Sequence, residues 1–165
     1  MRYPHARVLL ATATVVSGIL AGSAVDRVIV GGPAWHDLGA EAWAQYSRHA
    51  DLGTGLLAYP VEAIGGALLI VAAIVAGRRD SDAYWHPRAA PLYCALASSI
   101  AGLLVTVKAA PIMLGLAGSQ PAVAVETAFG EFFLWGLYVR GSVDVLAFAA
   151  LVWALSVPYH VDKRP

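Results

Sequence analysis

Four long apolar stretches dominate the chain, and short polar segments separate them. Each stretch meets the roughly 20 residues that a helix rising about 1.5 Å per residue needs to cross about 30 Å of hydrocarbon. Lipid offers backbone amides no hydrogen-bond partner, so helices are the expected open-ended structure there. The pattern predicts one transmembrane domain over residues 1–165, an all-α integral membrane four-helix bundle. The predicted spans are about 8–30, 52–77, 89–117 and 123–157.

Composition supports a membrane protein and argues against several other classes. Hydrophobic residues make up 59% of the chain and charged residues 13%, whereas about a quarter of the residues of a soluble domain are charged. Eleven basic residues balance eleven acidic ones, so no net field attracts nucleic acid. The single cysteine, Cys94, forms no group with histidines, and no metal or other cofactor is expected.

Basic residues collect on one side of the predicted membrane. The first loop offers Arg48, with Arg27 at its edge, and the third loop has no basic residue. Positive-inside bias therefore predicts a multi-pass protein of the cell membrane with both termini in the cytoplasm. The basic residues of the termini and the middle connection are Arg2, Arg7, Arg78, Arg79, Arg88, Lys163 and Arg164.

The N-terminal stretch has a second interpretation. Arg2 and Arg7, the apolar run from Val8 and the small residues at 21–24 also fit a cleaved signal peptide. Cleavage would leave three spans and would break the agreement between an even number of spans and basic residues at both ends of the chain. The first stretch is therefore interpreted as a membrane span.

The first loop, between Gly31 and Asp51, predicts a short interfacial helix over the outer end of the bundle. In and after segment 37–46, the residues Leu38, Ala42, Gln45 and His49 recur at helical spacing. An ordinary amphipathic connector is equally compatible with this pattern. The loop also holds aromatic residues of the kind that favour the headgroup layer, namely Trp35, Trp43 and Tyr46.

Charged residues occur inside the spans, where each costs about 2.5–3.5 kcal/mol on insertion scales. They are Glu62, Lys108, Glu131, Arg140 and Asp144. Their depth predicts an outward-facing polar pocket beneath the first loop. The competing interpretation is structural: Arg140 and Asp144 at i and i+4 would neutralise each other, and Lys108 would pair with Glu62 or Glu131 to hold the bundle.

Other polar residues lie at span boundaries. Arg27, Asp51 and Glu126 fit simple interfacial ends, since boundary side chains can reach the headgroup layer. His49 and Asp51 could also bind a metal together with His36, but three loop ligands of unknown geometry favour no particular metal.

The order of motifs resembles the anthrone-oxygenase-like family of small four-helix membrane proteins, much of which has no known function. The motifs are Gly18 and Gly22 in span one, Gly-Pro-Ala-Trp ending at Trp35, Lys108-Ala-Ala-Pro111-Ile-Met, and Trp135-Gly-Leu-Tyr138-Val-Arg140. In the family pattern a histidine lies between the tryptophan and the arginine of span four, and here Tyr138 stands in that stretch.

The resemblance implies oxidation of anthrones to anthraquinones by molecular oxygen without metal or flavin, that is, a cofactor-independent membrane oxygenase. In such an enzyme Glu62 or Glu131 would be the base, and Lys108 and Arg140 would stabilise the anion. The residues expected around a lipophilic aromatic or quinone-like substrate are Phe129, Phe133, Trp135, Tyr138, Asp144 and Trp43.

A non-catalytic function is the alternative: a membrane accessory subunit, or a carrier of small molecules or protons. Four spans are few for a carrier, so that version predicts a homo-oligomer. Under both interpretations the expected partners are the lipid bilayer and a small lipophilic ligand, and not nucleic acid.

Overall fold

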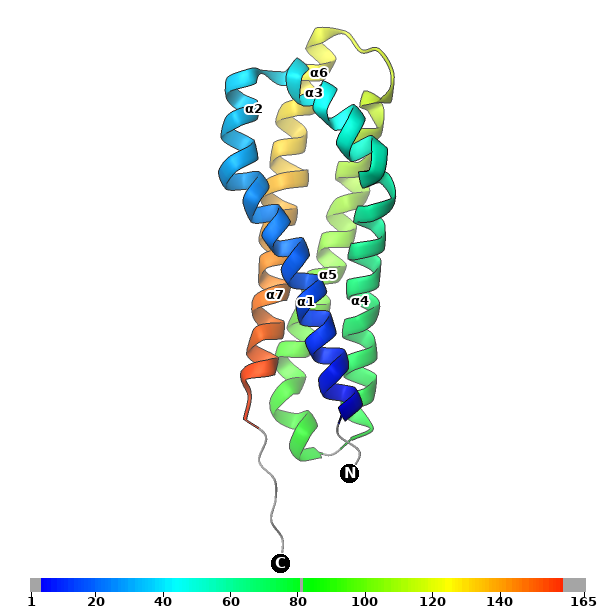
Figure 1. Cartoon of the computed structure of the whole chain (residues 1–165), viewed down its shortest axis with the longest axis vertical. Coiled ribbons are helices and arrows are strands. Elements are labelled where there is room, and N and C mark those ends of the chain that lie inside the picture. The colour runs from blue at the N-terminus through cyan, green and yellow to red at the C-terminus, as the bar shows by residue number, and fades with distance from the viewer. Residues whose placement is uncertain (1–3, 81, 159–165) are drawn as a thin grey trace, which may run out of the picture.

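The computed structural model describes residues 4–80 and 82–158, which form a bundle of long helices (Figure 1). Four helical segments are long and apolar enough to cross a membrane. The prediction of an all-α chain with four such helices is confirmed, and each predicted span lies in one of them except at Val157. The segments are His5–Leu38, Ala40–Arg78, Tyr84–Ala117 and Ala122–Ser156.

Each long helix of the bundle packs against two others. Helix α1 (Pro4–Asp26) contacts α4 (Gly55–Arg78) and α7 (Arg140–Ser156), and α5 (Asp82–Leu114) contacts the same two helices. The start of α1, the end of α7 and the connection from α4 to α5 lie at the lower end in Figure 1. The chain therefore runs up and down the bundle alternately.

Shorter helices close the upper end. Helices α2 (Gly32–Leu38) and α3 (Ala40–His49) follow α1, and α6 (Ala122–Phe132) follows a 3₁₀ turn at Gly115–Ala117. Figure 1 shows α3 crossing the end of the bundle beside α6. Gly39, at φ +88°, separates α2 from α3, in a region where side chains are strained and glycine is not.

A helix does form in the first loop, but it does not run through the whole predicted segment. Segment 37–46 is not one helix, because Gly39 interrupts it. The face of α3 that packs on the bundle does not include His49, which is exposed. That face consists of Ala40, Trp43, Ala44 and Ser47. Trp43 has no exposed surface, so it belongs to the core and not to a headgroup layer.

The interior has two apolar layers with a polar layer between them. The lower layer includes Leu10, Ile70, Leu92 and Leu151. The upper layer is largely aromatic and includes Trp43, Met113, Phe129, Phe132 and Phe133. Along each helix the polar residues fall between these layers: Ser17 on α1, Glu62 on α4, Ser99 on α5, and Arg140 and Asp144 on α7.

Candidate ligand cavity

A cavity of about 360 Å³ lies between α4 and α5, in the upper half of the bundle. This volume is within the range of pockets that hold small molecules, about 300–1,000 Å³. Its walls are mainly apolar, and polar side chains lie at its two ends. Arg27, Asp51 and Tyr59 form one end, and Arg140 lies at the other.

The cavity opens sideways, between two helices that are apolar enough to cross a membrane. Leu56 and Ile64 of α4 line it, as do Val107 and Leu114 of α5. Each of these four side chains is more than half exposed, and Val107 is 73% exposed. The mouth of the cavity is therefore itself apolar.

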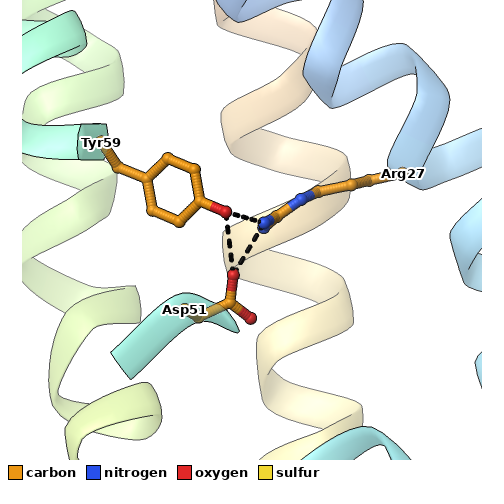
Figure 2. Close-up of polar contacts among 3 residues, drawn as sticks. All are labelled: Arg27, Asp51 and Tyr59. Carbon is orange, nitrogen blue, oxygen red and sulfur yellow. Dashed lines mark hydrogen bonds and ion pairs between the residues drawn. The ribbon is translucent and has the colours of Figure 1, made fainter. Parts of the chain in front are cut away.

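Three side chains make a hydrogen-bonded group at the upper end of the cavity (Figure 2). Arg27 Nη2 donates to Asp51 Oδ1 at 2.7 Å, and the Tyr59 hydroxyl donates to the same oxygen at 3.1 Å. Arg27 Nη2 also donates to the Tyr59 hydroxyl, and its guanidinium carbon lies 4.9 Å from the centre of the Tyr59 ring. We call these residues the Arg27–Asp51–Tyr59 cluster.

The second carboxylate oxygen of Asp51, Oδ2, is set apart from the hydrogen bonds of this cluster. Asp51 is only 5% exposed, and its Oδ2 makes no hydrogen bond within the part of the chain that the structure describes. Figure 2 shows this second oxygen turned away from Arg27 and Tyr59. A buried carboxylate oxygen without a hydrogen-bond partner costs at least about 1–3 kcal/mol.

Departures from regular α-helical geometry determine where the ionic side chains lie. Arg27 begins the π-helical turn Arg27–Gly31, and Arg140 follows the π-helical segment Phe133–Val139. Asp51 lies in the kinked turn Ala50–Thr54, where the backbone of Gly53 is not helical. π-Helical turns place an extra residue in the helix and often occur at functional sites. Here they rotate the residues on either side relative to each other, and the polar side chains reach one cavity.

A second, much smaller cavity lies in the polar layer. It has about 20 Å³ of space, which is enough for one water molecule. Glu62, Asp144 and Arg140 line it, and Arg140 Nε lies 3.8 Å from Asp144 Oδ2. Arg140 belongs to the walls of both cavities, so it connects the polar layer with the larger space.

The predicted site residues fall into separate groups. Arg140, Glu62 and Asp144 come together around the small cavity. Lys108 and Glu131 are exposed and line neither cavity; the Lys108 ammonium lies 5.9 Å from the centre of the Trp135 ring.

The predicted aromatic residues also lie outside both cavities. Trp43 contacts Phe129, and Phe129 contacts Phe133, all within the upper core layer. Tyr138 is 48% exposed. The aromatic side chain that does line the large cavity besides Tyr59 is Phe132, which sequence reasoning did not select.

The sequence interpretation also missed the Arg27–Asp51–Tyr59 cluster. It treated Arg27 and Asp51 as separate span ends and did not consider Tyr59. The available signal was the opposite charge of Arg27 and Asp51 at neighbouring span ends on the same side of the bundle. Glycine at position 55, four residues before Tyr59, was a second signal, since the Tyr59 ring needs that space.

The alternative of a loop metal site finds no geometric support. The residues that the structure describes contain no group of three histidine, cysteine, aspartate or glutamate side chains arranged to hold a metal ion. His36 instead packs its ring against Phe129 and Phe133, and His49 is exposed.

Comparison of the chain with family models, curated proteins and solved structures finds no match.

Proposed function

We propose that this chain is a multi-pass protein of the cell membrane that binds a small lipophilic molecule in the cavity between α4 and α5. The ligand reaches the cavity from the hydrocarbon of the bilayer, through the opening between the two helices. The observation that carries this proposal is the lateral position of a 360 Å³ apolar cavity with a hydrogen-bonded polar cluster at one end.

The charge distribution supports an orientation for this cavity. The basic connections favour cytoplasmic placement of both termini and of the loop between α4 and α5. The Arg27–Asp51–Tyr59 cluster lies toward the opposite end of the bundle. With this orientation the cavity lies in the outer half of the membrane, and α3 covers that end of the bundle.

The proposal is tested by filling the cavity. Ala110 lines the cavity on α5, and Ala110→Phe would place a ring in it. Ala97→Phe is the matched control, because Ala97 is exposed on the same helix and lines neither cavity.

Native mass spectrometry of protein released from membranes measures whether a small molecule stays bound. The wild type and Ala97→Phe should carry the same adduct, and Ala110→Phe should lack it. An adduct that persists in Ala110→Phe would contradict binding in this cavity.

A cofactor-independent oxygenase is the second candidate, and the position of Arg140 favours it. A ring in the large cavity would have the Arg140 cation at one end, with the carboxylates of Glu62 and Asp144 behind it. In the reaction that the family resemblance implies, an anthrone and one oxygen molecule yield an anthraquinone and one water. Lys108 and Glu131 have no part in this version, because they line neither cavity.

An oxygen electrode tests the second candidate with anthrone as the substrate. The wild type in nanodiscs should consume one oxygen per anthrone, and Arg140→Leu should not. Oxygen uptake no faster than in empty nanodiscs would rule out this activity and leave ligand binding as the function.

A further inference from the structure

The small cavity in the polar layer is surrounded by all four long helices of the bundle. Glu62 reaches it from α4, and Arg140 and Asp144 reach it from α7. Helices α1 and α5 contribute the hydroxyl side chains of Ser17 and Ser99 and no charged residue. Two carboxylates and one guanidinium therefore surround a space of about 20 Å³ between the two apolar layers.

These three charged groups make few contacts with the rest of the protein. Arg140 Nε lies 3.8 Å from Asp144 Oδ2, which is too far for a hydrogen bond. Glu62 forms no hydrogen bond or ion pair with any residue that the structure describes. The side chains of Arg140 and Asp144 are 20% and 9% exposed, and both line the cavity. A very small ligand can therefore contact them.

The formal charges of this layer do not balance. When all three groups are ionised, two negative charges face one positive charge. The apolar layers on either side supply no counter-ion, since their buried residues are all hydrophobic. Arg27, the other arginine that lines the large cavity, is already paired with Asp51 at 2.7 Å. An uncompensated charge inside a span is costly, so the layer needs one further positive charge.

The cavity favours a proton over a metal ion as the source of this charge. Its space is that of about one water molecule. A calcium or magnesium ion takes about six or more oxygen ligands, and the Arg140 guanidinium would repel any metal ion at such close range. A proton needs only one carboxylate oxygen. Two carboxyl groups that share a site bind one proton readily, because both cannot ionise without repelling each other.

We propose that the polar layer is a proton-binding site, in which Glu62 and Asp144 share one exchangeable proton beside Arg140. The site holds the proton at neutral pH and releases it as the pH rises. Because Arg140 lines both cavities, the proton also changes the charge at the end of the large cavity. The site itself does not depend on the proposed ligand.

Infrared spectroscopy measures this proton through the carbonyl stretch of a protonated carboxyl group. The protein is studied in a maltoside detergent, which has no carbonyl group of its own. Exposed carboxylates are ionised at neutral pH, so the wild type should show the band there and lose it at alkaline pH. A wild-type spectrum without the band at neutral pH would overturn the proposal, and so would a band that does not change with pH.

Three variants count the protons. Glu62→Gln and Asp144→Asn each leave a single carboxylate to balance Arg140, so both should lack the band at neutral pH. Arg140→Leu leaves two carboxylates without a cation, and both should take up a proton, which gives about twice the wild-type intensity. Glu126→Gln is the matched control, because Glu126 is exposed and lines neither cavity. It should keep the wild-type band.

The outcomes separate this proposal from ligand binding. A band that survives in Glu62→Gln or in Asp144→Asn would show that the proton is not shared, and would overturn the assignment. The adduct measured by native mass spectrometry would still stand as evidence for the large cavity. If Arg140→Leu fails to fold, the wild-type titration and the two nearly isosteric carboxyl variants carry the test.

Discussion

The ring of Tyr59 occupies the space in which a side chain at position 55 would lie. A Cβ built on Gly55 comes within 2.5 Å of Tyr59 Cε2 and within 2.8 Å of the carbonyl oxygen of Ala50. Gly55 is the first residue of α4 and follows the kinked turn Ala50–Thr54, which carries Asp51. The missing side chain at this position therefore allows Tyr59 to reach both Arg27 and Asp51.

Gly55→Ala should disrupt this arrangement without changing any member of the cluster. Overpacking of this kind costs about 1–3 kcal/mol. With a Cβ at position 55, neither the Tyr59 ring nor the Ala50 carbonyl oxygen can keep its position. We expect a lower melting temperature in detergent and weaker ligand binding. Gly65→Ala is the control on the same helix, since a Cβ there meets nothing within 4 Å. A melting temperature equal to that of Gly65→Ala would show that the space is not required.

Arg140 and Asp144 should behave as a pair. Removing one partner of a buried ion pair typically costs about 3–5 kcal/mol, because the other charge remains uncompensated. Arg140→Leu would leave Asp144 and Glu62 together around the small cavity. The double variant with Asp144→Leu should melt closer to the wild type than Arg140→Leu does. A double variant less stable than both single variants would contradict the pairing.

Trp43 should contribute to stability as a core residue. It has no exposed surface and packs against Phe129 and Phe132. Trp43→Ala should therefore cost about 3–5 kcal/mol, as for other buried aromatic residues. Trp153→Ala is the comparison, because Trp153 is 57% exposed. Similar melting temperatures for the two variants would contradict the core position of α3.

Cysteine labelling tests the proposed orientation. In a Cys94→Ala background, a membrane-impermeant maleimide applied to intact cells should label Gln45→Cys on α3. It should label Arg79→Cys, after α4, only when the membrane is opened. Labelling of both positions in intact cells would place the two connections on the same side and contradict the four-span topology.

The polar layer could be predicted from the sequence because charged residues inside a membrane span are energetically costly. Glu62, Arg140 and Asp144 stand out in spans where charge is expensive, and the structure brings them together. The four helices were predictable for a related reason, since their apolar length exceeds what a soluble core requires.

The large cavity could not be predicted in the same way. Regular helical spacing puts Glu126 on one face with Phe129 and Arg140, but Glu126 is exposed and the π-helical segment Phe133–Val139 changes the register before Arg140. Nothing in the local pattern marks such a segment. Tyr59 is likewise an ordinary aromatic residue in the sequence, and only its position between Arg27 and Asp51 gives it a role.

An experimental density map of the wild-type protein, purified with its native lipids, tests the central claim most directly. We predict non-protein density between α4 and α5, in the cavity whose upper end is formed by the Arg27–Asp51–Tyr59 cluster. The same map of Ala110→Phe should lack this density, while the Arg27–Asp51–Tyr59 cluster remains in place. A wild-type map in which α4 and α5 close on each other, with side chains filling the space, would contradict the account.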